Sequence, residues 1–159
     1  MDFYLVRHGE ATSPAQDPRR PLTAWGAEEV RRLATWAAEA GVRVDQVRHS
    51  GKARAEETAT LLGAKLRPPQ GVIAVPGLMP MDDVRPVADG LRAEPGSVML
   101  VGHLPFLGLL AGHLLAGAPD GDAVPFPPAG LACVARAGDG WRLRWVVRPD
   151  ALPTSGVLP

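Results

Sequence analysis

Cysteine is almost absent from this 159-residue chain, which contains only Cys133. A single cysteine can form no disulfide within the chain and cannot build a cysteine-based zinc cluster. A reducing compartment is therefore the expected setting, and we predict a cytoplasmic protein. Cys133 lies in the apolar run 131–135, which favours a buried side chain over a nucleophile.

The sequence also lacks an excess of charge of either sign, because 17 Lys and Arg residues balance 17 Asp and Glu residues. A neutral chain is not expected to bind nucleic acid or a membrane surface through bulk charge. The longest apolar run, 104–116, is too short to span a bilayer. Charged residues follow directly on the first apolar run, so we expect no secretory signal.

Short apolar runs alternate with amphipathic segments along most of the chain. This alternation predicts an α/β fold with a mostly parallel central sheet and helices on both faces, which gives three α/β/α layers. We assign residues 1–148 to one domain and residues 149–159 to a frayed C-terminal tail. The expected strands are 3–6, 44–49, 71–75, 97–101 and a hairpin of 131–136 with 141–147; the expected helices are 24–40, 52–62, 84–93 and 104–116.

Two histidines follow apolar strands in the same way, each next to a glycine. His8 stands in the sequence Arg7-His8-Gly9-Glu10 after the first strand, and His103 follows Gly102 after strand 97–101. In a parallel sheet the carboxyl ends of the strands share one edge, where ligands bind. We therefore expect the two histidines to meet there, beside a helix N-terminus that favours an anion.

Basic side chains are expected at the same edge. Arg54 opens the second helix after another strand, in the segment 50–58, and Arg7 precedes His8. A planar guanidinium can hold a phosphate with two hydrogen bonds. Two arginines and two histidines around one point suit a phosphoryl group and the charge that builds on its oxygens. No histidine or carboxylate pattern has metal-ligand spacing, so we predict no metal and no cofactor.

These motifs, in this order, resemble the histidine phosphatase superfamily, also called the phosphoglycerate-mutase-like family, and the short chain is most similar to its small SixA-type phosphohistidine phosphatase branch. The resemblance implies that His8 is the nucleophile and becomes a phosphohistidine, which water then hydrolyses. It also implies that Arg7, Arg54 and His103 bind the phosphoryl oxygens. The motifs that carry the resemblance are Arg7-His8-Gly9, Pro21-Leu22-Thr23 with Gly26, Ser50 to Thr58, and Gly102-His103.

The nucleophile must be neutral at its attacking nitrogen, so we expect a backbone carbonyl near Gly9 to hold the other ring nitrogen of His8. His103 would be most useful in its protonated form. His49 either borders the pocket or serves only the strand end. Four further residues are predicted to contact the substrate: Gly9, Glu10, Ser50 and Gly102.

The sequence departs from the family in its general acid. Many members place a Glu or Asp after the third strand to protonate the leaving group, and the matching stretch 76–83 contains no Glu. Asp82 or Asp83 either fills this role or caps the helix that follows. The Asn that the mutases carry shortly after Arg-His-Gly is also absent. Both absences favour a phosphoramidate such as phosphohistidine, whose imidazole leaves more readily than an alkoxide, and disfavour a mutase.

Three functions follow in order of preference. The first is a phosphohistidine phosphatase that acts on a phosphorylated protein domain, because a short chain leaves the site open. The second is a phosphomonoesterase for a small sugar phosphate or nucleotide, which needs Asp82 or Asp83 near the leaving oxygen. The third is a phosphate-binding module without turnover, which the pair His8 and His103 disfavours. We predict a monomer whose partner is its substrate, a phosphorylated protein domain or a small phosphorylated metabolite.

Overall fold

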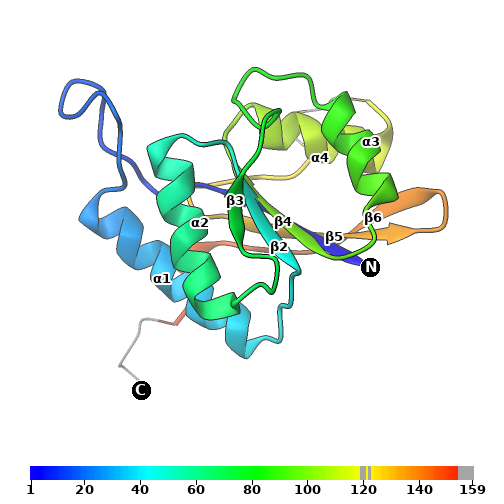
Figure 1. Cartoon of the computed structure of the whole chain (residues 1–159), viewed down its shortest axis with the longest axis horizontal. Coiled ribbons are helices and arrows are strands. Elements are labelled where there is room, and N and C mark those ends of the chain that lie inside the picture. Colours follow the sequence, from blue (N-terminus) through cyan, green and yellow to red (C-terminus); the bar gives the residue numbers. More distant parts are fainter. Residues whose placement is uncertain (119–120, 122, 154–159) are drawn as a thin grey trace.

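The computed structural model describes residues 1–118, 121 and 123–153. One six-stranded sheet, in the order β3-β2-β4-β1-β5-β6, runs through the molecule (Figure 1). Its first four strands are mutually parallel, and β5 and β6 form an antiparallel hairpin at the other edge. The elements are β1 (Asp2–Arg7), α1 (Ala24–Glu39), β2 (Gln46–His49), α2 (Ala53–Leu66), β3 (Val72–Ala74), α3 (Arg85–Ala93), β4 (Val98–Gly102), α4 (Phe106–Ala116), β5 (Leu131–Ala137), β6 (Gly140–Val147) and the 3-10 helix η1 (Pro149–Ala151).

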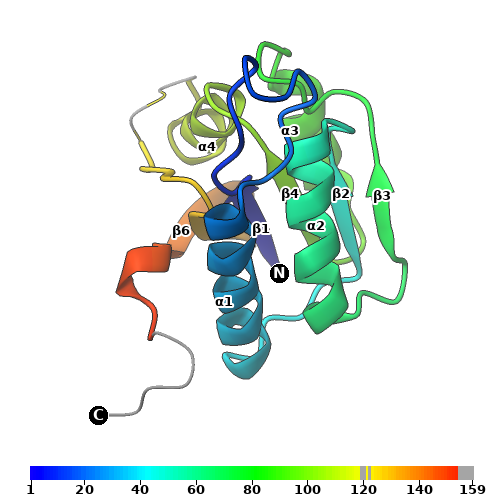
Figure 2. The same cartoon turned by 90° about the vertical axis from the view of Figure 1, so that its left-hand side faces the viewer.

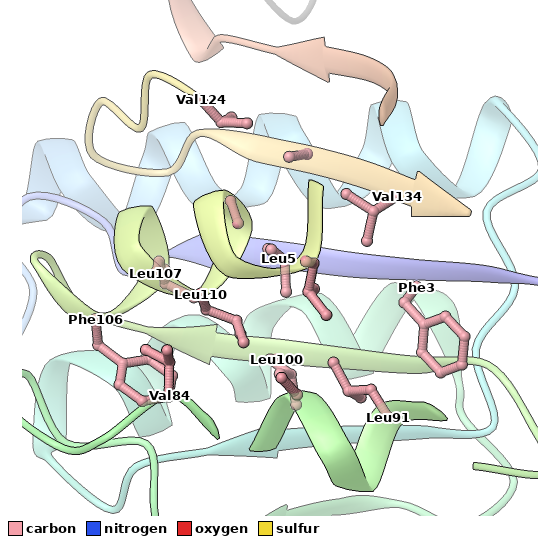
Figure 3. Close-up of a cluster of buried hydrophobic side chains, with 14 of the residues drawn as sticks. Phe3, Leu5, Val84, Leu91, Leu100, Phe106, Leu107, Leu110, Val124 and Val134 are labelled. Carbon is pink, nitrogen blue, oxygen red and sulfur yellow. The ribbon is translucent and has the colours of Figure 1, made fainter. Parts of the chain in front are cut away.

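Helices cover both faces of this sheet, which confirms the predicted α/β/α layers (Figure 2). Successive strand residues point to opposite faces. Phe3 and Leu5 of β1 therefore pack with α3 and α4, in the cluster that Figure 3 shows. Tyr4 and Val6 pack with α1 and α2 on the other face. Within the described residues, no helix is both long enough and apolar enough to cross a membrane.

Helix α2 runs four residues beyond its expected end at residue 62, and ends only where Arg67 takes a left-handed backbone with φ of 50°. The prediction stopped the helix before Gly63. That glycine instead lies inside the helix. A Cβ at this position would overlap the side chain of Val72, so a glycine is needed there. Close packing of α2 on β3 therefore explains a residue that a helix interior otherwise disfavours.

The beginning of the expected tail is ordered by contacts with α1. Pro149 is buried in η1, and the Arg32 guanidinium donates hydrogen bonds to the carbonyl oxygens of Pro149 at 3.2 Å and Leu152 at 2.8 Å. Residues 149–152 of the expected tail therefore contact α1. Residues 154–159 lie outside the described part of the chain.

Candidate active site

His8 and His103 lie side by side at the carboxyl edge of the sheet. Strands β1 and β4 are parallel neighbours with Arg7 opposite Gly102, so the residues that follow them emerge together. The His8 amide donates to the Gly102 carbonyl at 3.0 Å, and the two imidazole centroids are 5.1 Å apart. Both histidines are buried. The pairing of two apolar strands thus builds a two-histidine centre from residues 95 positions apart.

The His8 ring is fixed in the form that a nucleophile needs. Its Nδ1 lies 2.7 Å from the Gly9 carbonyl oxygen, which can only accept a hydrogen bond, so Nδ1 carries the proton. The lone pair is then on Nε2. Burial lowers the pKa of His8 to about 4, and the charges of Arg54 and Arg7 act in the same direction. His8 is therefore neutral at physiological pH.

His103 has one ring nitrogen engaged and one free. Its Nε2 lies 2.6 Å from the Ser50 hydroxyl, while its buried Nδ1 has no hydrogen-bond partner in the described residues. Burial, followed by the charges of His8 and Arg54, lowers the pKa of His103 to about 3. A hydroxyl can donate to neutral imidazole or accept from imidazolium. Ser50 can therefore hold this ring in either protonation state, and Nδ1 remains available to a ligand.

The two predicted arginines retain unused hydrogen-bond donors. Arg7 gives one guanidinium nitrogen to the Phe126 carbonyl at 3.0 Å, but its Nε has no partner among the described residues. The Nε of Arg54 is likewise buried without a partner there. Burial lowers the pKa of both guanidinium groups, which still remain charged. Buried donors of this kind suit an anion that would complete their hydrogen bonding.

Close backbone packing holds the His8 segment in place. Thr58 of α2 receives the Gly9 amide at 3.0 Å and donates to the Arg54 carbonyl at 2.8 Å, so it joins the His8 and Arg54 segments. A Cβ on Gly26 would overlap the Glu10 carbonyl oxygen and lie 2.9 Å from the Glu10 nitrogen. The start of α1 therefore packs directly against the backbone that follows His8.

Comparison with known proteins decides the family. Residues 3–85, just over half of the chain, match the sequence model of the histidine phosphatase superfamily (branch 1). The chain belongs to the histidine phosphatase superfamily. It is 35% identical over 122 residues to the phosphohistidine phosphatase SixA of Escherichia coli (strain K12), a match that covers 74% of this chain and 76% of the relative.

Solved structures agree with this assignment. The structure of the protein histidine phosphatase SixA complexed with tungstate superposes with a TM-score of 0.83 at 31% identity, and the match covers 94% of this chain and 98% of that one. The alpha-ribazole phosphatase from Shigella flexneri shares the fold, with a TM-score of 0.75 at 19% identity over 98% of this chain and 100% of that one. The protein is thus a phosphatase of the histidine phosphatase type.

This histidine phosphatase has a third basic residue at the site that the sequence analysis missed. The charge of Arg20 contributes to lowering the pKa values of His8, His103 and Arg54. Its Nε donates to the Thr12 carbonyl at 3.0 Å, and its backbone is left-handed with φ of 50°. Arg20 belongs to an irregular loop before Pro21, and such a loop has no periodic pattern that would single the residue out.

Other predicted pocket residues have local structural partners. The exposed Glu10 carboxylate accepts the Thr23 hydroxyl at 2.9 Å, at the N-terminus of α1. His49 is buried, and its Nδ1 accepts the Gly51 amide at 3.1 Å. His49 therefore shapes the turn that carries Ser50, and we assign it no contact with substrate.

The candidate general acids are both engaged in the loop before α3. Asp83 accepts hydrogen bonds from the Arg85 amide at 3.0 Å and from its guanidinium at 2.7 Å, which lowers the pKa of Asp83 to about 2. It holds no proton to donate at neutral pH, so Asp83 is unsuited to this role. Asp82 accepts the Met79 amide at 2.9 Å within a turn. The alternative interpretation, loop and helix capping, fits both contacts.

Metal binding has no obvious site in the described ranges 1–118, 121 and 123–153. These residues contain no group of three or more His, Cys, Asp or Glu side chains that could hold a metal ion.

Proposed function

We propose that this phosphatase hydrolyses phosphohistidine on a protein, with His8 as the covalent nucleophile. The observation that carries the proposal is the His8 ring, which is neutral and held by the Gly9 carbonyl so that Nε2 has a free lone pair. The similarity to proteins named as phosphohistidine phosphatases supports the choice of substrate. The single cysteine supports a reducing compartment, and we propose that the enzyme works in the cytoplasm as a monomer.

In the first step, His8 Nε2 attacks phosphorus, and the bond from phosphorus to the substrate imidazole breaks. If the other nitrogen of that imidazole carries a proton, the leaving group departs as neutral imidazole and needs no acid. Arg7, Arg54 and His103 would hold the phosphoryl oxygens and stabilise their charge. In the second step, water attacks the phosphorus bound to His8. Dihydrogen phosphate leaves, and His8 returns to its neutral form.

Among the described residues, both candidate general acids, Asp82 and Asp83, are engaged in their own loop, and this separates phosphohistidine from alkyl esters. An alkoxide must gain a proton as it leaves, and a positioned acid typically contributes about 100-fold or more to such a step. Because Asp83 is ionised and Asp82 is bound in a turn, we expect poor turnover of sugar phosphates. A phosphorylated small metabolite is therefore the less favoured substrate.

We expect the wild-type enzyme to hydrolyse phosphohistidine with a kcat/KM at least about 100-fold above that for an alkyl phosphate such as glycerol phosphate. Both rates would be measured by phosphate release, with and without EDTA, and EDTA should change neither. A preference for the alkyl ester would contradict the proposed substrate. Loss of all activity in EDTA would contradict the metal-independent mechanism.

Anion binding should also draw a proton into the site. His103 is neutral at pH 7 because its pKa is lowered to about 3, and an anion beside it stabilises the protonated form. Sulfate keeps its charge throughout pH 5–9, so proton uptake on sulfate binding belongs to the protein. We expect uptake of up to one proton, and affinity that falls as pH rises. Calorimetry in buffers of different ionisation enthalpy measures this.

His103→Asn is the matched variant for that experiment, since asparagine cannot titrate. Its sulfate binding should be weaker and should lack the proton uptake. Undiminished uptake in this variant would assign the proton to another group and contradict the role of His103.

A further inference from the structure

Large apolar side chains are exposed on the segments that adjoin the site. Among the described residues, seven large apolar side chains are exposed, and four of them belong to the segments around His8 and His103. We call these four the apolar rim. They are Met81, which is 83% exposed, Trp25 at 57%, Met79 at 41% and Leu104 at 38%. Isolated exposed apolar residues are common, but several near one cluster of polar site residues indicate a binding surface.

Each part of the rim adjoins a segment that carries a site residue or lies against one. Leu104 directly follows His103. Trp25 precedes Gly26, which lies against the Glu10 backbone two residues after His8. The Leu78 carbonyl oxygen, next to Met79, is 3.8 Å from the position that a Gly102 Cβ would take. Figure 2 shows the loops after β1 and β3 at the same end of the sheet.

The most exposed member is presented by a well-bonded turn. The Asp82 amide donates to the Met79 carbonyl at 3.1 Å, and the Asp82 carboxylate accepts the Met79 amide at 2.9 Å. Pro80 occupies the second position of this turn, where its fixed φ is favourable. Met81 therefore stands at the tip of a defined loop. The flexible methionine side chain can adapt to differently shaped apolar surfaces.

We propose that the apolar rim is a docking surface for the folded protein domain that carries the phosphohistidine. The inference rests on the proposed function. The phosphoryl group must reach the buried donors of the pocket, so whatever is attached to it crosses the rim. A small metabolite does not extend far beyond the polar residues of the site, so it buries little of the rim side chains. A domain whose phosphohistidine has apolar surface neighbours buries the side chains of the rim, and this burial strengthens the binding of the domain.

The test compares one reaction on two substrates in the variant Met79→Gln/Met81→Gln. The substrates are the free amino acid phosphohistidine and a folded domain phosphorylated by phosphoramidate on one histidine that has exposed apolar neighbours. We expect kcat/KM for the domain to fall about tenfold or more, mainly through KM. The value for free phosphohistidine should change less than twofold, which also shows that the variant is folded.

Ile73→Gln/Leu143→Gln is the matched control, because it removes two exposed apolar side chains from β3 and β6, outside the rim. It should leave both substrates unaffected. Equal falls on both substrates in the rim variant, or no fall on the domain, would overturn the docking proposal while the proposed function stands. A wild-type enzyme that hydrolyses neither phosphohistidine substrate would instead overturn the proposed function itself.

Discussion

His8→Ala is expected to lower kcat for phosphohistidine by about 10⁴-fold or more, because removing a covalent nucleophile removes the reaction path itself. The substitution takes away the lone pair on Nε2, which the Gly9 contact at Nδ1 holds in a fixed direction. Alanine cannot be phosphorylated, and water attacking the substrate directly would lack a comparably placed base. Single-turnover phosphate release measures the loss.

Trapping the intermediate makes this prediction specific. Rapid alkaline quenching of the wild type during turnover of a ³²P-labelled substrate should yield a labelled protein whose bond is acid-labile, as a phosphoramidate bond is. His8→Ala should give no label. His113→Ala, on helix α4 outside the histidine pair, is the matched control and should keep both label and rate. Wild-type turnover in His8→Ala, or label on another residue, would refute the nucleophile assignment.

The placement of the histidine pair could be predicted because it depends on local patterns. Two continuous apolar runs make β1 and β4 buried parallel strands, and parallel strands present their carboxyl ends at one edge. The tether of His8 was predictable too, because a nucleophile needs one ring nitrogen held by an acceptor. The acceptor is the carbonyl oxygen of the next residue, Gly9, which lies 2.7 Å from His8 Nδ1.

Features that depend on side chains meeting across the fold could not be predicted in the same way. Arg20 reaches the site from a loop without periodicity, and its hydrogen bond to Thr12 exists only once the loop has folded back. Arg32 orders residues 149–152 through two carbonyl groups that are far away in sequence. The ion pair with Arg85 that keeps Asp83 ionised was likewise not apparent from the carboxylate alone.

The charges around the site affect both the binding of a phosphoryl group and the protonation state of the two histidines. Burial and neighbouring positive charges lower the pKa values of both histidines, so the positive charge of the site at neutral pH lies on its arginines. We expect an arriving phosphoryl group to complete the hydrogen bonding of the arginines and to favour a proton on His103. His8 can remain neutral, because the contact with the Gly9 carbonyl already uses its proton. The two imidazoles therefore differ in their expected roles because His8 contacts a carbonyl oxygen and His103 contacts a hydroxyl group.

Gly26→Ala is expected to lower the free energy of unfolding by about 3 kcal/mol. The added methyl group would overlap the Glu10 carbonyl oxygen and crowd the Glu10 nitrogen, and both are backbone atoms that cannot rotate away. The backbone after His8 would have to move, so activity should fall along with stability. Urea unfolding followed by circular dichroism measures the change, and phosphohistidine hydrolysis at 25 °C measures the activity of the fraction that remains folded.

Gly90→Ala is expected to change the free energy of unfolding in the opposite direction. Gly90 lies in α3, and a Cβ there meets nothing within 4 Å. Alanine in a helix interior is favoured over glycine by about 0.5–1 kcal/mol, so this variant should be slightly more stable and fully active. Two glycine-to-alanine changes in helices should therefore differ in sign, because only Gly26 is needed for close backbone approach. Equal stability of the two variants would show that α1 can shift away from Glu10 without cost, and the tight packing behind the nucleophile would then not be needed to hold it.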